Sequence, residues 1–278
     1  MKGIILNYKL LICCFLLTNL VLLSSASAGI YYVDKGHSSA SDNNSGAETS
    51  PWLSIQKAAK VLKAGDTVYV KNGIYNEKVS VANSGTEDAP IVFKAYPGHT
   101  PIIDGNGVSA SSYIGLFYSS GKNYITLDGF EIRNYSTVLV TIQRGKGLIL
   151  RNCTIHTSSS APGLMFDHNS SGLVENNELY DVKDNGMSFE SSSNITIQYN
   201  YIHDAPNHNG IDLKPKTSEP RAYYSNNKVI GNKITRVTNA IFLRYQLNAE
   251  IYNNLMVNIC VIQQHLPHMQ GGLRFKIR

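Results

Sequence analysis

The sequence of 278 residues contains few charged side chains, a single tryptophan and no long block of lysine and arginine. Charged residues make up only 16% of the chain, which is too few for a coiled coil or a disordered charged tail. The formal net charge of +5 is spread along the chain, so nucleic acid is not an expected partner. Apolar residues at 42% are enough for a packed core. The composition therefore predicts a folded, turn-rich protein and leaves a polyanionic partner open.

Only one stretch is strongly apolar, and it lies at the start of the chain, from Leu10 to Leu23. Lys2 and Lys9 precede it, and the small residues Ala26-Ser27-Ala28 follow it. This pattern predicts a secretory signal peptide over residues 1–28. No other stretch approaches the roughly 18 apolar residues of a membrane span. We therefore expect a secreted or cell-surface protein without a membrane span, and a monomer.

A short motif that ends in an aliphatic residue recurs about every 23 residues. Four copies end at Ile132, Ile155, Leu179 and Ile202, and two more copies follow them. Each copy contains short β-type pieces with Asn or Gly at the corners. The predicted fold is all-β, a single-stranded right-handed parallel β-helix of about 23 residues per coil over residues 29–262. A leucine-rich-repeat horseshoe has a similar period, but its Leu-x-x-Leu-x-Leu framework is missing.

The two ends of the predicted β-helix differ in sequence. Residues 53–62 place Ile55, Ala58, Ala59 and Leu62 on one helical face, which predicts a capping helix over the exposed first coil. Strands are expected next at residues 67–70, 91–95 and 101–104. Residues 263–278 fit neither a coil nor a cap, and we expect an irregular or truncated tail there.

Four cysteines are present, two of them inside the predicted signal peptide. The repeat places the other two, Cys153 and Cys260, about four coils apart. At about 4.8 Å per coil, this separation exceeds the roughly 7 Å allowed between bridged Cα atoms. We expect two free, mostly buried thiols.

The N-terminal part resembles the entry segment of secreted right-handed β-helix polysaccharide lyases, family 9 pectate lyases being the nearest group. The resemblance covers residues 30–105 and rests on four segments: Tyr31–Asp34, Pro51–Ala59, Ala64–Val70 and Gly73–Tyr75. It implies a lyase that acts on an acidic polysaccharide such as pectate. Many β-helices that are not lyases share this entry, so it specifies the fold better than the chemistry.

Alternation along the strands predicts an outward stripe of charged side chains on neighbouring coils. The stripe consists of Asp167, Glu190, Lys214 and Arg244, with Asp212 on the same side as Lys214. This set suits β-elimination from a uronate, which needs a base for the C5 proton and neutralisation of the sugar carboxylate. We predict that Lys214 is the base and that Arg244 neutralises charge. Beside bare carboxylates Lys214 would stay protonated, whereas cationic neighbours would lower its pKa.

Calcium is the predicted cofactor, with Asp167, Glu190, Asp212 and Asp184 as candidate ligands. By resemblance, Asn209–Lys214 is similar to the strand that carries the lysine base of family 9 pectate lyases. Asp184-Asn185-Gly186 is similar to part of their calcium motif, but Asn185 and Ser188 stand where that motif has acidic residues.

The coil between Ile202 and Ile234 is about nine residues longer than its neighbours. Long loops of solenoids often lie on the binding face. Four residues of this coil are therefore predicted to contact substrate: Lys216, Arg221, Tyr223 and Tyr224.

Several alternatives stay open. The stripe is also compatible with a surface salt-bridge ladder on a non-catalytic carbohydrate-binding or structural β-helix. A glycoside hydrolase needs paired carboxylates, but the polygalacturonase signatures are missing. A uronate C5 epimerase shares the proton-abstraction step, and Phe166-Asp167-His168 has a partial likeness to its Asp-Pro-His motif. His156 and His203 are expected to stack around Tyr180 rather than bind metal.

Overall fold

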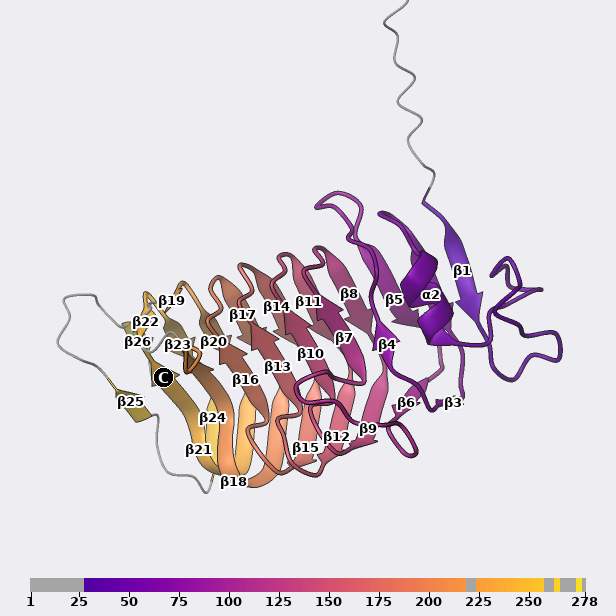
Figure 1. Cartoon of the computed structure of the whole chain (residues 1–278). Helices are drawn as coiled ribbons and strands as arrows, with labels where there is room; N and C mark the ends of the chain where they lie inside the picture. Colours follow the sequence, from indigo (N-terminus) through magenta and orange to yellow (C-terminus); the bar gives the residue numbers. More distant parts are fainter. Residues whose placement is uncertain (1–27, 219–223, 258–262, 266–273, 277–278) are drawn as a thin grey trace, which may run out of the picture.

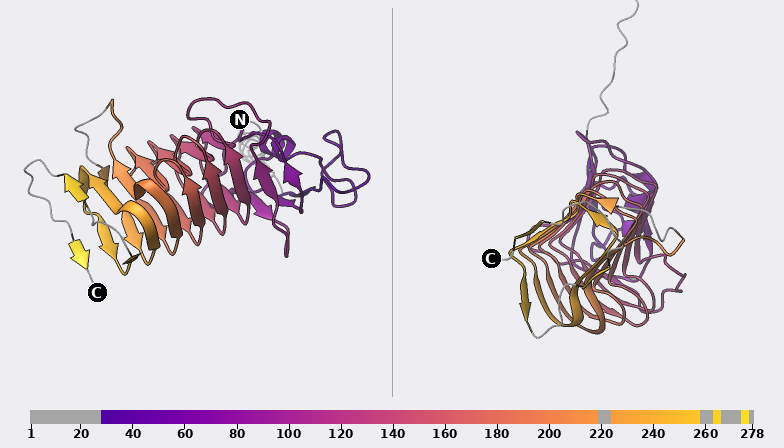
Figure 2. Two further views of the ribbon diagram at one scale, coloured as in Figure 1. Left: turned by 90° about the horizontal axis from the view of Figure 1, so that it is seen from below. Right: turned by 90° about the vertical axis from the view of Figure 1, so that its left-hand side faces the viewer.

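The computed structural model describes residues 28–218, 224–257, 263–265 and 274–276. These residues form a stack of coils in which strands of successive coils pair in parallel (Figure 1). The coils follow one another along a single axis, with β1 (Ile30–Val33) at one end and β26 (Arg274–Lys276) at the other (Figure 1). Seen from one end, the coils superpose around a shared interior (Figure 2). The predicted parallel β-helix is confirmed.

Between the first and the last coil, each coil contributes strands to three faces. The first face is a ten-stranded sheet. Its strands are β1 (Ile30–Val33), β2 (Thr67–Val70), β5 (Ile91–Ala95), β8 (Ile125–Asp128), β11 (Leu148–Arg151), β14 (Gly172–Glu175), β17 (Ile195–Gln198), β20 (Lys228–Ile230), β23 (Glu250–Tyr252) and β26 (Arg274–Lys276).

The second and third faces form one sheet, because the long strands β18 (Tyr201–Lys214) and β21 (Lys233–Arg244) run through the corner between them. The second face also contains β3 (Ile74–Tyr75), β6 (Ile102–Asp104), β9 (Glu131–Tyr135), β12 (Thr154–Ser158), β15 (Glu178–Val182) and β24 (Leu255–Val257). The third face also contains β4 (Val79–Ser80), β7 (Phe117–Ser120), β10 (Val140–Gln143), β13 (Leu164–Asp167), β16 (Met187–Glu190) and β25 (Gln263–His265). A short pair, β19 (Tyr224–Ser225) and β22 (Gln246–Leu247), lies beside them.

The turn between the first and second faces has the same backbone form in successive coils. Its first residue has a positive φ, which Asn and Gly adopt more readily than other residues. The second residue is an asparagine in four successive coils, Asn177, Asn200, Asn232 and Asn254, of which the first three are buried. Each side-chain amide of the first three donates to the next side-chain oxygen at 2.9 to 3.0 Å. This ladder fixes the register of the coils from inside the turn.

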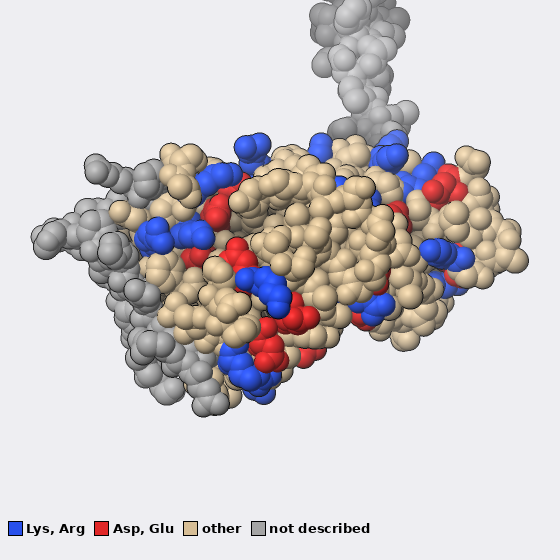
Figure 3. Space-filling model, turned by 60° about the horizontal axis from the view of Figure 1, so that its bottom comes forward, with Lys and Arg blue, Asp and Glu red and all other residues tan. Residues whose placement is uncertain are grey.

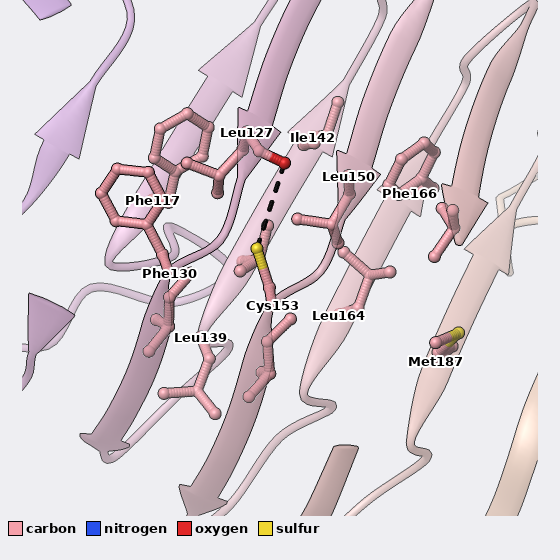
Figure 4. Close-up of a cluster of buried hydrophobic side chains, with 14 of the residues drawn as sticks. Phe117, Leu127, Phe130, Leu139, Ile142, Leu150, Cys153, Leu164, Phe166 and Met187 are labelled. Carbon is pink, nitrogen blue, oxygen red and sulfur yellow. Dashed lines mark hydrogen bonds between the residues drawn. The ribbon is translucent and has the colours of Figure 1, made fainter. Parts of the chain in front are cut away.

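Aliphatic and aromatic side chains from all three faces fill the interior (Figure 4). Cys153 lies among them as a fully buried free thiol, with its Sγ 4.0 Å from the carbonyl oxygen of Leu127. Burial raises the pKa of this thiol to about 12, because a thiolate would lose its hydration. The predicted state of Cys153 is confirmed, whereas Cys260 lies outside the described residues.

The N-terminal coil is covered as the sequence predicts. Helix α2 (Ile55–Val61) buries Ile55, Ala58 and Ala59, and Leu62 is buried just after it. Ser54 caps the helix, and the Glu77 carboxylate accepts hydrogen bonds from two further backbone N–H groups at its start. The expected strands match β2, β5 and β6. The predicted signal peptide and most of the predicted tail lie outside the described residues, and the predicted domain limits stay predictions.

Candidate functional site

A charged stripe runs along the outside of the third face, near the ends of its strands. Asp167 pairs in register with Glu190, and Glu190 pairs with Lys214. Arg244 ends the next strand, where Leu213 pairs with Leu243. The residues just before the four stripe positions are buried in the core: Phe166, Phe189, Leu213 and Leu243. The alternation therefore aligns the stripe as predicted, while the roles of its residues stay predictions.

Lys214 is held between two carboxylates. Its Nζ lies 2.8 Å from Asp212 Oδ2 and 3.7 Å from Glu190 Oε1. Asn185 Nδ2 also donates to Asp212 Oδ2, at 3.1 Å. The second oxygen of Asp212 is buried and has no hydrogen-bond partner among the described residues. Among the described residues, Oδ2 of Asp212 therefore has two partners and Oδ1 has no hydrogen-bond partner.

This arrangement keeps Lys214 positively charged. Burial alone would lower the pKa of Lys214, but the charge and hydrogen bond of Asp212, together with Glu190, outweigh burial and raise that pKa above 10.5. Burial raises the pKa values of Glu190 and Asp212, with Lys214 opposing the rise in both. The expectation that Lys214 stays protonated beside bare carboxylates agrees with this direction.

A second cluster surrounds Asp167, whose carboxylate is fully buried. One of its oxygens contacts His168 Nδ1, and the other lies 2.6 Å from Lys216 Nζ. Lys216 follows β18, so its side chain reaches back two coils, and its backbone N–H donates to Ser191 Oγ at 2.9 Å. Lys216, predicted to contact substrate, is therefore already ion-paired. Coil spacing did not reveal how far this side chain reaches, and alternation alone did not place the turn residue His168 in the cluster.

The other predicted site residues lie apart from the stripe or lack a close ion pair. Asp184 precedes β16 and contacts His208 Nδ1 at 3.3 Å and the backbone N–H of Asn185 at 2.7 Å. Arg244 lies over the Phe242 ring, with its guanidinium carbon 5.2 Å from the ring centroid. Tyr224 belongs to β19 and not to the third face. Arg221 and Tyr223 lie outside the described residues.

The predicted calcium ligands do not form a calcium-type cluster. Nowhere in the described part of the chain do three or more His, Cys, Asp or Glu side chains gather in a way that could hold a metal ion. Asp167 and Asp212 are each ion-paired with a lysine. Calcium takes six to eight oxygen ligands, and these residues as arranged do not fit it. Calcium as a cofactor stays a prediction.

The second face carries a separate stack of rings. His156, Tyr180 and His203 lie on successive coils, with centroids 4.6 and 5.1 Å apart and nearly parallel planes. Each histidine also contacts a glutamate of the preceding coil. The expected polar stack is confirmed, and it strengthens the outer surface of the solenoid.

The charges of the protein gather unevenly. Figure 3 shows acidic and basic side chains interleaved on one side of the molecule, next to a broad area of other residues.

Within the described residues, no helix is both long and apolar enough to cross a membrane.

Comparison with known proteins gives a family match over most of the solenoid. A family model described as "Pel9A-like, right handed beta helix region" matches residues 31–216. Pectate lyase PEL9 of Emericella nidulans is 38% identical over 81 residues, which cover 28% of this chain and 19% of that protein. The uncharacterized protein YwoF of Bacillus subtilis is 32% identical over 97 residues, 34% of this chain and 21% of that protein. The matched part thus spans about a fifth of each relative.

Solved structures share the fold at low sequence identity. Pectate lyase Pel9A has a TM-score of 0.56 at 16% identity, covering 81% of this chain and 70% of that one. XylC in complex with xylose has a TM-score of 0.59 at 15% identity, covering 86% and 72%. The GH136 lacto-N-biosidase of Eubacterium ramulus has a TM-score of 0.55 at 13% identity, covering 84% and 57%. These likenesses show the fold alone.

Proposed function

Because the chain belongs to the Pel9A-like right-handed β-helix family, we propose that it is an exported lyase that cleaves a uronate-containing polysaccharide by β-elimination. The sugar chain would lie across the strands of the third face, parallel to the axis of the solenoid. The observation that carries the proposal is the half-buried Lys214, which stands between Asp212 and Glu190 with Arg244 on the next coil.

Each step of β-elimination has a candidate group in this stripe. The guanidinium of Arg244 is a cation, so it can neutralise the sugar carboxylate and acidify the C5 proton. The free amine of Lys214 then takes that proton, the bond from C4 to the leaving oxygen breaks, and the leaving oxygen takes a proton from water. The products are a chain with a C4–C5 double bond and a chain with a new hydroxyl group.

The ion pair with Asp212 sets a condition on this mechanism. Because the pKa of Lys214 is raised, only a small fraction of the amine is free at neutral pH. The proposed lyase therefore works best in alkaline solution. Any cation that screens Asp212 and Glu190 would raise the unprotonated fraction of Lys214. The activity assay is therefore run with and without calcium.

Two other functions would use the same face. A C5 epimerase would remove the same proton and return one to the opposite side, without breaking the chain. A non-catalytic binding protein would hold the polysaccharide by the same charges without chemistry. Saturated cleavage products, with new reducing ends and no double bond, would indicate a glycoside hydrolase instead.

The product type separates these functions. Purified protein is incubated with polygalacturonate, alginate and chondroitin, each with added calcium and with chelator. Ultraviolet absorbance reports the C4–C5 double bond, a reducing-end assay reports any chain cleavage, and solvent deuterium at C5 reports epimerisation. We expect absorbance with one polymer. Reducing ends without absorbance, or deuterium uptake without cleavage, would contradict the proposal.

A further inference from the structure

Arg144, just before the charged stripe, and Arg244, its last member, both lack a carboxylate partner among the described residues. Arg144 follows β10, one coil before Asp167, and Arg244 ends β21, one coil after Lys214. No carboxylate of a described residue lies within 4.0 Å of either guanidinium. By contrast, Lys214 and Lys216 between them are both ion-paired. The two unpaired guanidiniums are therefore the groups available to an incoming anion.

The backbone places Arg144 beside the stripe. Arg144 and His168 occupy the same turn position in successive coils, with φ values of 56° and 55°. Their backbone N–H groups donate to the next coil in the same way, Arg144 to Asp167 at 2.8 Å and His168 to Glu190 at 2.9 Å. The ring of His168 reaches the Asp167 carboxylate, so a side chain at this turn position reaches the stripe. The longer Arg144 side chain has the same reach one coil earlier.

The stripe position next to Arg144 is uncharged. Gln143 pairs in register with Asp167, and its Nε2 donates to Tyr118 Oη at 2.5 Å and to Ser120 Oγ at 3.1 Å. No acidic residue of its own coil therefore neutralises Arg144, unlike Lys214 beside Asp212. Arg144 is also exposed to solvent and can take a ligand carboxylate in two parallel hydrogen bonds.

We propose that Arg144 and Arg244 bind two carboxylates of the same polyuronate chain and so set the shortest chain that the protein binds well. This inference rests on the proposed function, because it takes the substrate to be a uronate polymer on the third face. Four coil steps separate the two arginines, which is about 19 Å at about 4.8 Å per coil. With roughly one sugar unit per coil, a chain of about five uronates reaches both arginines.

The test measures binding separately from cleavage. Titration calorimetry uses oligogalacturonates and oligoalginates of two to seven units at pH 6, where Lys214 is protonated and the proposed cleavage is slow. Wild-type protein is compared with Arg144→Ala, Arg144→Lys and the control Lys146→Ala. Lys146 is exposed and lies only two residues from Arg144, but its Nζ lies over the Tyr124 ring, 5.4 Å from the centroid.

We expect wild-type affinity to rise sharply near five units. Arg144→Ala should weaken binding of the longer chains about tenfold, with a loss that shrinks as the chain shortens. Arg144→Lys should recover only part of the affinity, since it keeps the charge without the two-pronged hydrogen bond. Lys146→Ala should change affinity less than twofold.

Three results would overturn the inference: no dependence on chain length, equal losses in Arg144→Ala and Lys146→Ala, or no binding of any oligouronate. A length-dependent loss in Arg144→Ala, without unsaturated product in the cleavage assay, would uphold the inference and reject the lyase reaction. Unsaturated product in the cleavage assay, with no effect of Arg144→Ala on binding, would uphold the lyase reaction and reject the inference.

Discussion

Lys214 Nζ lies 2.8 Å from Asp212 Oδ2, and both side chains stand on the outside of the same strand. Asp212 is almost fully buried, so its carboxylate has little water to solvate it and depends on Lys214 and Asn185. The acid in turn fixes the lysine as a cation. One ion pair thus determines in which pH range the proposed base becomes active.

The cleavage rate should rise with pH through the neutral and mildly alkaline range. The pKa of Lys214 is raised above 10.5, so the free amine increases about tenfold per pH unit below that value. Initial rates at several pH values, with far-ultraviolet circular dichroism to verify folding, measure this. A rate that is flat and then falls in alkaline solution would mean that Lys214 acts as a cation and not as the base.

Asp212→Asn should shift the pH–rate profile to lower pH. The substitution removes the negative charge that contributes most to raising the pKa of Lys214, so burial lowers this pKa. At mildly alkaline pH, the cleavage rate of the variant, as a fraction of its own maximal rate at high pH, should be several-fold higher than the same fraction for the wild type. Glu178→Gln, which removes an acid of the second face that contacts His203, is the matched control and should leave the profile in place.

Lys216→Met should destabilise the fold by about 1–2 kcal/mol. The change leaves the buried Asp167 carboxylate with His168 but without its lysine, and the partial exposure of Lys216 limits the loss. Urea unfolding followed by circular dichroism gives the free energy. Lys228→Met is the control, since its pair with Glu250 is exposed and should contribute less than about 0.5 kcal/mol. Equal effects of the two substitutions would show that the Asp167 pair has no special weight.

Asn200→Ala should lower the free energy of unfolding by about 2–4 kcal/mol. The Asn200 side chain accepts from the backbone N–H of Asn177 and donates to the carbonyl of Val174, so both buried groups lose a partner. Chemical denaturation measures the change against Asn43→Ala, an exposed residue whose loss should stay within about 0.5 kcal/mol. A near-neutral Asn200→Ala would mean that the ladder does not stabilise the coils.

Cys153 should not react with iodoacetamide in the folded protein at neutral pH. Its thiol is fully buried and has a pKa of about 12, so both access and thiolate are lacking. Peptide mass mapping after labelling, with and without urea, reports this site separately from Cys260. Labelling without denaturant, at the rate of a free thiol, would contradict the described burial.

The repeat could be predicted from the sequence because inward residues obey simple periodic rules. Ile155, Leu179 and Ile202 recur once per coil, and each is buried where the spacing placed it. The same alternation placed Asp167, Glu190 and Lys214 in one outward stripe. Periodicity is reliable here because one face of every strand must be buried.

The contacts within the stripe did not follow from periodicity. Lys216 pairs with Asp167 across two coils, and His168 reaches the same acid from a turn, because long side chains and turn backbones are not bound to the strand period. Asn185 and Lys214 both bind Oδ2 of Asp212, so this carboxylate, predicted as a calcium ligand, is ion-paired within the protein. The alternation also did not indicate Arg144, because this residue lies in the turn after β10, outside the strand period.

The most direct test of the account compares wild-type protein with Lys214→Ala and the control Lys60→Ala on the polymer that the wild type attacks. Lys60 is an exposed lysine of helix α2, at the N-terminal end of the solenoid and several coils before Lys214. Ultraviolet absorbance of the C4–C5 double bond is followed in mildly alkaline solution. We predict that the wild type and Lys60→Ala form unsaturated product at the same rate. The rate of Lys214→Ala should be lower by at least about a hundredfold. Unsaturated product formed by Lys214→Ala at the wild-type rate would contradict the assignment of Lys214 as the base.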